Sequence, residues 1–142
     1  MPLDEIDYIT LIEKIHDLFI ASFKENIVFI AKQEAIEHME YFKIQYKYLP
    51  LQYDIVFESE HNIFTIDIYD CEGAKNTLYR IEKYNNETKI NNVQAAIQLL
   101  KEILQNDDLY FYITQNGKIY RKKGQQYKRI KDLTEITENS KE

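Results

Sequence analysis

The chain of 142 residues is short of several residue types, and each shortage excludes a class of protein. It has one cysteine, two prolines, three glycines and no tryptophan. These counts exclude a disulfide scaffold, a collagen-like repeat and a Pro/Gly-rich disordered chain. The three glycines are isolated from one another at Gly73, Gly117 and Gly124. The sequence therefore contains neither a P-loop nor a dinucleotide-binding Gly-x-Gly-x-x-Gly motif.

Long apolar runs and targeting signals are also missing. The longest unbroken apolar run covers residues 27–31, far short of the ~20 apolar residues that span a bilayer. The N-terminus is acidic where a signal peptide would be basic, and the lone Cys71 can form no internal disulfide. We therefore expect a cytoplasmic protein without a membrane partner. Abundant Lys, Ile, Asn and Tyr, with only three arginines, are typical of a low-GC bacterium or a mobile element within one.

The residues that are present predict one α+β domain. With 44% hydrophobic residues, a chain of this length can build one core but not two. We assign residues 1–131 to that domain and expect 132–142 to be a mobile acidic tail.

Helical periodicity predicts two helices at the N-terminus and a third near residue 100. Asp4 is a suitable N-cap for the first, and apolar residues then recur at helical spacing to Phe23. A second helix is expected from Asn26 to about Glu40, although residues 27–31 alone also fit a short strand. The third covers about 91–105, where Asn91 to Gln94 has the spacing of a capping box.

Alternating apolar and polar residues predict an antiparallel sheet of about five to six strands, covered on one face by the helices. The strand-like runs lie at residues 42–48, 53–58, 63–69, 78–84 and 126–130, together with a hairpin at 109–123. If 53–58 and 63–69 form a hairpin, Ile55 and Phe57 share its core face with Ile66 and Ile68.

The strongest local signal is Asn116-Gly117, between two strand-like runs. This dipeptide favours a two-residue type I′ turn because both central residues need positive φ. The predicted register pairs Gln115 with Lys118, Ile113 with Tyr120, and Tyr112 with Arg121.

Charge and tyrosine are unevenly distributed, and they define two candidate binding surfaces. The net charge is -6, yet residues 118–131 carry seven bases and no acid, and 11 of the 12 tyrosines lie from Tyr41 onward. The first surface, the acidic set, is expected on the outer sheet face. Its members are Asp54, Glu58 and Asp67. The second is a basic, aromatic surface on the C-terminal hairpin, formed by Tyr110, Tyr112, Arg121, Lys122, Lys123, Lys128 and Arg129.

No catalytic, metal-binding or cofactor-binding motif occurs, so we predict no catalytic residues, no metal and no cofactor. The three histidines lack the spacing of a zinc site. A Cys71 nucleophile with His61 as its base, or acid/base work by Asp54 with Asp67, are weaker alternatives.

The sequence therefore predicts a small non-catalytic protein that acts by binding another protein. An immunity protein, a toxin inhibitor or a phage-type modulator of a host protein would fit, with a basic toxin or host enzyme bound to the acidic set. The alternative is a nucleic-acid-binding module, in which Tyr110 and Tyr112 stack on bases and the hairpin cations contact phosphate. The hairpin could also bind an acidic partner. The overall negative charge disfavours nucleic acid.

Overall fold

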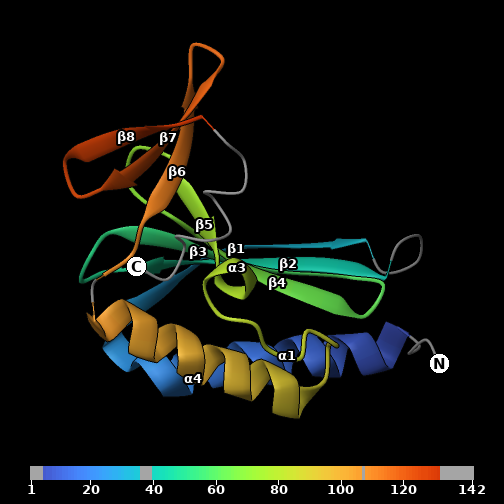
Figure 1. Ribbon diagram of the computed structural model, residues 1–142. Helices are drawn as coiled ribbons and strands as arrows, with labels where there is room; N and C mark the ends of the chain where they lie inside the picture. The colour runs from blue at the N-terminus through green and yellow to red at the C-terminus, as the bar shows by residue number, and fades with distance from the viewer. Residues whose placement is uncertain (1–4, 36–39, 107, 132–142) are drawn as a thin grey trace.

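A single antiparallel sheet runs through the whole protein. The computed structural model describes residues 5–35, 40–106 and 108–131 (Figure 1). Within them, eight strands pair in sequence order from β1 to β8. The strands are β1 (Ile27–Ala35), β2 (Tyr41–Tyr48), β3 (Tyr53–Glu60), β4 (Ile63–Tyr69), β5 (Lys75–Thr77), β6 (Phe111–Gln115), β7 (Lys118–Lys123) and β8 (Gln126–Ile130). The α+β class is confirmed, but the predicted five to six strands are too few.

The helical elements are α1 (Glu5–Phe23), the 3₁₀ turn η1 (Lys24–Asn26), the short α3 (Leu78–Ile81) and α4 (Ile90–Asn106). Figure 1 shows α1 and α4 side by side beneath β1–β4, where together they cover one face. We call α1, α4 and β1–β4 the body. No helix in the described ranges is long and apolar enough to cross a membrane.

Aromatic side chains fill the space between the two layers of the body. Phe19 of α1 stacks on Tyr46 of β2, with ring centroids 4.6 Å apart, and contacts Phe57 of β3 edge-on. Phe57 in turn stacks on Phe42 and Phe64. All five side chains are fully buried. Burial of such large apolar surfaces is the main stabilising term of the body.

The hairpin of β3 and β4 has the predicted register. Ile55 pairs with Ile68 and Phe57 with Ile66, and all four are buried against the helices. The register places Glu58 and Thr65 on the other face of the sheet. No helix in the described ranges lies over β1–β4 on that side (Figure 1).

The predicted second helix from Asn26 to about Glu40 is wrong, because residues 27–35 form strand β1. Helix α1 ends at Phe23, and the next residue, Lys24, has a positive φ of +52°. Strand β1 then pairs with β2. Residues 27–30 are β-branched or aromatic and suit a strand. Residues 31–35 are helix formers by propensity, which pairing with β2 overrides.

The predicted strand at residues 78–84 is also wrong. The strand of this region is the short β5, and Leu78–Ile81 is a single helical turn. Leu78 and Ile81 are both buried at a spacing of three, which a helix can satisfy and an alternating strand cannot. Strand β5 takes the place of the predicted strand at 78–84, and β1 is the strand that the predicted runs lack.

Helix α4 and its buried stripe agree with the prediction, apart from the N-terminus. The helix begins at Ile90, so Asn91 lies inside it and is not the N-cap. Its buried residues are Val93, Ala96, Ile97, Leu100 and Leu104. The proposed N-cap Asp4 and the tail 132–142 lie outside the described residues.

Strands β6, β7 and β8, which we call the arm, extend away from the body. Figure 1 shows the arm rising on the side of the sheet opposite the helices. The β6–β7 register is the predicted one, with Gln115 opposite Lys118, Ile113 opposite Tyr120 and Tyr112 opposite Arg121. Asn116 and Gly117 have φ values of +53° and +74°, as a type I′ turn requires.

Candidate functional site

The acidic set lies on the helix-free face of the body, but each of its carboxylates already has a partner. The contacts are Asp54 with Lys47 Nζ at 3.0 Å, Glu58 with the Tyr41 hydroxyl at 2.6 Å, and Asp67 with Thr77 Oγ1 at 2.9 Å and Lys75 Nζ at 3.5 Å. Burial, together with the hydrogen bond to Glu58, raises the pKa of Tyr41 to about 12. Lysines of the sheet therefore compensate the charges of Asp54 and Asp67, while Glu58 has a hydrogen bond from a neutral hydroxyl.

One face of the arm gathers cationic and aromatic side chains. In an antiparallel pair, directly opposed residues point to the same side. Arg121 of β7 lies opposite Tyr112 of β6 on one side and opposite Lys128 of β8 on the other. A row of two cations and one ring therefore crosses three strands on a single face.

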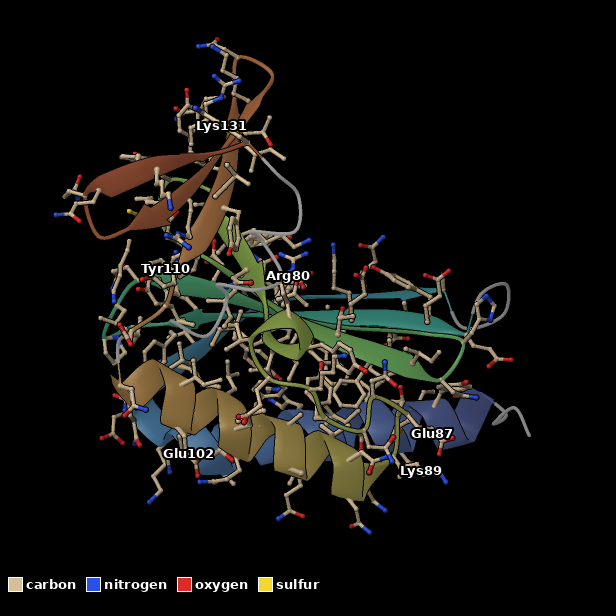
Figure 2. The ribbon with its side chains drawn as sticks, viewed as in Figure 1. Arg80, Glu87, Lys89, Glu102, Tyr110 and Lys131 are labelled. Carbon is tan, nitrogen blue, oxygen red and sulfur yellow. The ribbon has the colours of Figure 1, made fainter. Side chains whose placement is uncertain are left out.

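Cation–ring contacts extend this row. The Arg121 guanidinium lies 4.5 Å from the centroid of the Tyr110 ring, and Lys123 Nζ lies 5.0 Å from it. Arg80 of α3 lies over Tyr112 at 5.9 Å. Tyr110 is at the base of β6, where the arm meets the body (Figure 2). We call this surface the cationic face; its members are Arg80, Tyr110, Tyr112, Arg121, Lys123 and Lys128.

Three of these cations form no ion pair with another described residue. Among the described residues, no carboxylate forms an ion pair with Arg80, Arg121 or Lys128. Like charges placed directly opposite each other, as Arg121 and Lys128 are, destabilise a strand pair. An anionic group bound across them would remove that repulsion.

Lys122 and Arg129, which the sequence grouped with this surface, lie on the other face of the arm. Lys122 pairs with Tyr127, and Arg129 pairs with Tyr120. The grouping missed this because it placed every base of residues 121–129 on one surface, whereas adjacent strand residues point to opposite sides.

Lys122 is buried and serves to attach the arm to the body. Its side chain is 5% exposed, and its Nζ donates hydrogen bonds to Asp70 Oδ2 at 2.6 Å and to Glu72. Burial by itself would lower the pKa of Lys122, but the two carboxylates outweigh that effect and raise this pKa. The Tyr127 hydroxyl donates to the same Glu72 at 2.9 Å. The hydrogen bonds from Lys122 and Tyr127 lower the pKa of Glu72.

Asp70 also shapes the loop that receives Lys122. Its Oδ1 accepts hydrogen bonds from the backbone N–H groups of Glu72 and Ala74, both at 2.9 Å. One carboxylate thus fixes the β4–β5 loop with one oxygen and the arm with the other. The ion pair is a positioning contact within the fold.

A cavity of about 420 Å³ lies at this junction of body and arm. Its apolar lining includes Tyr53 and Phe111, and its polar lining includes Asp70, Cys71 and Lys122. Asp70 and Lys122 of this lining form an ion pair with each other.

The two catalytic alternatives fail on geometry. His61 precedes β4 and Cys71 follows it, and seven residues of strand separate their backbones by roughly 20 Å. Asp54 and Asp67 each contact a lysine and are not paired with each other. In the described ranges, no group of three or more His, Cys, Asp or Glu residues is placed to hold a metal ion.

Arg80 is the member of the cationic face that sequence reasoning missed. It lies in the segment 78–84, which the sequence predicts as a strand, far from the basic run at 118–131. Its contact with Tyr112 depends on the turn of α3 and on the pairing of β5 with β6 through Lys75 and Tyr112. A single arginine in an otherwise ordinary segment gives no sequence signal for such a contact.

Comparisons of this chain with protein-family models, with curated proteins and with solved structures gave no match.

Proposed function

We propose that this protein is a non-catalytic protein-binding domain, and that the cationic face of the arm recognises an acidic segment of its partner. The observation that carries the proposal is the contrast in charge compensation. Two of the three carboxylates of the acidic set, Asp54 and Asp67, form ion pairs with lysines of the sheet. Arg80, Arg121 and Lys128 have no ion pair among the described residues. Charge that the fold leaves uncompensated is available to a partner.

Arginine suits this role. The planar guanidinium presents N–H donors that match both oxygens of a carboxylate. Arg80 and Arg121 approach from two different elements, and the rings of Tyr110 and Tyr112 lie beneath them. Contact with the rings limits the motion of the arginine side chains, which reduces the entropy lost when a partner binds.

The structure gives less support to single-stranded nucleic acid as the ligand. Stacking requires a ring face that a base can reach. Tyr112 is only 9% exposed, and Tyr110 is already in contact with two cations. The proposed basic toxin bound to the acidic set is likewise less favoured, because Asp54 and Asp67 are already paired with lysines. A role as an immunity protein or toxin inhibitor stays a prediction.

The proposal can be tested by capture from a lysate of the source cell at low salt. Three full-length proteins are immobilised: the parent, the double variant Arg80→Ala/Arg121→Ala, and Lys89→Ala. Lys89 is a matched control because it is an exposed cation near the start of α4, distant from the arm (Figure 2). We expect the parent and Lys89→Ala to retain the same acidic protein, and the double variant to retain at least tenfold less, about 1.4 kcal/mol.

Nuclease treatment of the lysate separates the two partner classes. Capture that survives nuclease supports a protein ligand, and capture that nuclease abolishes supports nucleic acid and contradicts the proposal. Equal capture by the parent and the double variant would also contradict it.

A further inference from the structure

Strand β1 forms a long outer edge of the sheet and carries exposed apolar side chains. β1 is nine residues long, and β2 is its only neighbour among the described strands. Val28, Phe29 and Ile30 are 45–48% exposed. Unpaired N–H and C=O groups along such an edge can pair with another strand.

A bulge divides β1 into two parts. Phe29 lies opposite Tyr46 and Ala31 lies opposite Gln45, so Ile30 is an extra residue in the ladder. From Ala31 to Ala35 the register is continuous, and each residue has a partner in β2. Only this second part offers a regular edge of five residues.

The sequence of this regular part is complementary to itself in charge. It reads Ala31-Lys32-Gln33-Glu34-Ala35. If two copies align antiparallel about a two-fold axis at Gln33, then Lys32 of each lies opposite Glu34 of the other. The same alignment places Ala31 opposite Ala35 and Gln33 opposite Gln33.

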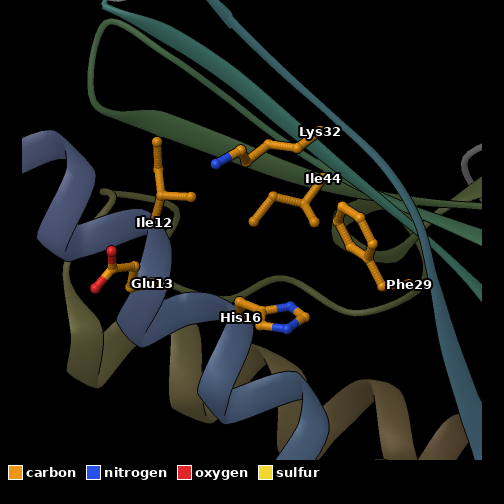
Figure 3. A pocket seen from close by; sticks show the side chains of 6 residues that line it. All are labelled: Ile12, Glu13, His16, Phe29, Lys32 and Ile44. Atoms are coloured by element: carbon orange, nitrogen blue, oxygen red, sulfur yellow. The ribbon is translucent and has the colours of Figure 1, made fainter.

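The two faces of the strand also match in this alignment. Lys32 and Glu34 lie opposite the core residues Ile44 and Phe42 of β2, so they point to the helix side. Figure 3 shows Lys32 on that side, together with Ile12, Glu13 and His16 of α1, around a pocket of about 190 Å³. Residues 31, 33 and 35 point to the other side. Every opposed pair would therefore share a face, as an antiparallel ladder requires.

The composition of residues 31–35 supports a second neighbour for this strand. Ala, Lys, Gln and Glu are helix formers and are depleted in strands. Conflict between local preference and the adopted structure is expected where a segment has a role beyond folding. Within one copy, Lys32 and Glu34 form an exposed ion pair at 3.0 Å, which stabilises the strand little.

We infer that a second copy of this chain pairs with β1 through residues 31–35, giving a two-fold symmetric dimer with one continuous sheet. Such an interface is isologous, because the same residues serve both copies. The dimer uses the edge opposite the arm in strand order, so both cationic faces stay outside the β1 pairing.

Charge reversal provides the first arm of the test. Sedimentation equilibrium measures the mass of the parent, of Lys32→Glu, and of the swap Lys32→Glu/Glu34→Lys. We expect the parent and the swap to reach twice 17.1 kDa, because the swap restores opposite charges across the axis. The single variant Lys32→Glu should have a dimer dissociation constant at least tenfold higher than that of the parent. A monomeric parent at millimolar concentration would overturn the inference.

Cross-linking provides the second arm, in a Cys71→Ser background that removes the exposed native thiol. The two-fold alignment places the Cα atoms of Gln33 about 4.5–5.5 Å apart, a separation that a disulfide can span. Under mild oxidation Gln33→Cys should form a covalent dimer. The matched control Gln126→Cys, on the other edge strand β8, should stay monomeric. Equal cross-linking of both variants, or of neither, would contradict the proposed register.

Discussion

The body and the arm belong to one sheet but are stabilised in different ways. In the body, α1 and α4 cover β1–β4, and a continuous set of aromatic and aliphatic side chains is buried between the layers. In the described residues, no helix covers the arm. Its contacts with the rest of the protein include the buried Lys122–Asp70 pair and the apolar side chains of Leu109 and Phe111. The body is thus specified mainly by burial, and the arm by a few directed contacts.

This difference explains where the fold can accommodate charged side chains without an ion-pair partner. A two-layer core leaves little room for uncompensated charge, because a buried charge must be paired. The arm has only one strand layer, so Arg121 and Lys128 can face outward without disturbing a core. The comparison shows structural constraint in the body, and it is the reason that we propose the arm as the recognition surface.

The largest effect should come from the centre of the body. Phe57→Ala removes a fully buried ring that contacts Phe19, Phe42 and Phe64. We expect a loss of about 3–5 kcal/mol in the free energy of unfolding, measured by urea denaturation. Phe57→Leu, which keeps most of the volume, should lose clearly less. Similar losses for the two variants would show that the core is loosely packed.

The attachment of the arm should come next. Lys122→Met leaves Asp70 buried without its cation, and removing one partner of a buried ion pair costs about 3 kcal/mol or more. We expect the low end because Glu72 is half exposed. Amide hydrogen exchange should accelerate in β6–β8 and stay slow in β2–β4.

The neighbouring lysine supplies the control for that experiment. Lys123 pairs with Asp108 at the surface, where both side chains are about half exposed. Lys123→Met should change stability by less than about 1 kcal/mol. If Lys122→Met accelerates exchange equally in body and arm, the two regions unfold together and the distinction between them fails.

The turn at the tip of the arm should give a smaller loss. Gly117 has φ +74°, and a Cβ added there would meet no atom within 4 Å. The cost of Gly117→Val therefore comes from backbone strain alone, about 1–3 kcal/mol. Gly117→Asn should cost less because asparagine tolerates positive φ. Thermal midpoints of both variants, compared with the parent, would show whether the turn has the proposed geometry.

Alkaline pH should weaken the body by a modest amount. Burial, and then the hydrogen bond to Glu40, raise the pKa of Tyr8 to about 12. A raised pKa in the folded state means that its contribution is complete below about pH 10 and is lost as the pH approaches 12. At pH 11 the loss from this group is about 1.4 kcal/mol. Urea denaturation from pH 9 to 12 should show a shallower decline for Tyr8→Phe than for the parent; identical slopes would exclude this contribution.

The sequence predicted best the parts whose structure is decided locally. The type I′ turn follows from Asn116-Gly117, and the strand register follows from that turn. Helix α4 and the β3–β4 hairpin follow from apolar periodicity, since each buries one face. These features need no knowledge of distant segments.

Features decided by tertiary contacts were missed. Residues 31–35 have a helical composition, yet β2 holds them in a strand. Leu78–Ile81 forms a turn of helix beside a strand of only three residues. The burial of Lys122 depends on Asp70, which lies 52 positions earlier in the chain, and the place of Arg80 on the cationic face depends on the same long-range arrangement. The sequence therefore predicted most of the residues that form the two candidate surfaces. It did not predict which of their charges have a partner within the fold.

The central claim is that the cationic face, rather than the acidic set of the body, binds the partner. It is tested most directly by fluorescence anisotropy with a labelled glutamate-rich peptide at low salt. The proteins compared are the parent, Arg80→Ala/Arg121→Ala and Asp54→Asn/Glu58→Gln, with thermal midpoints recorded for each. We expect the arm variant to bind at least tenfold more weakly with little change in its thermal midpoint, and the acidic-set variant to bind as the parent does. Equal affinity of the parent and the arm variant for the peptide would contradict the claim.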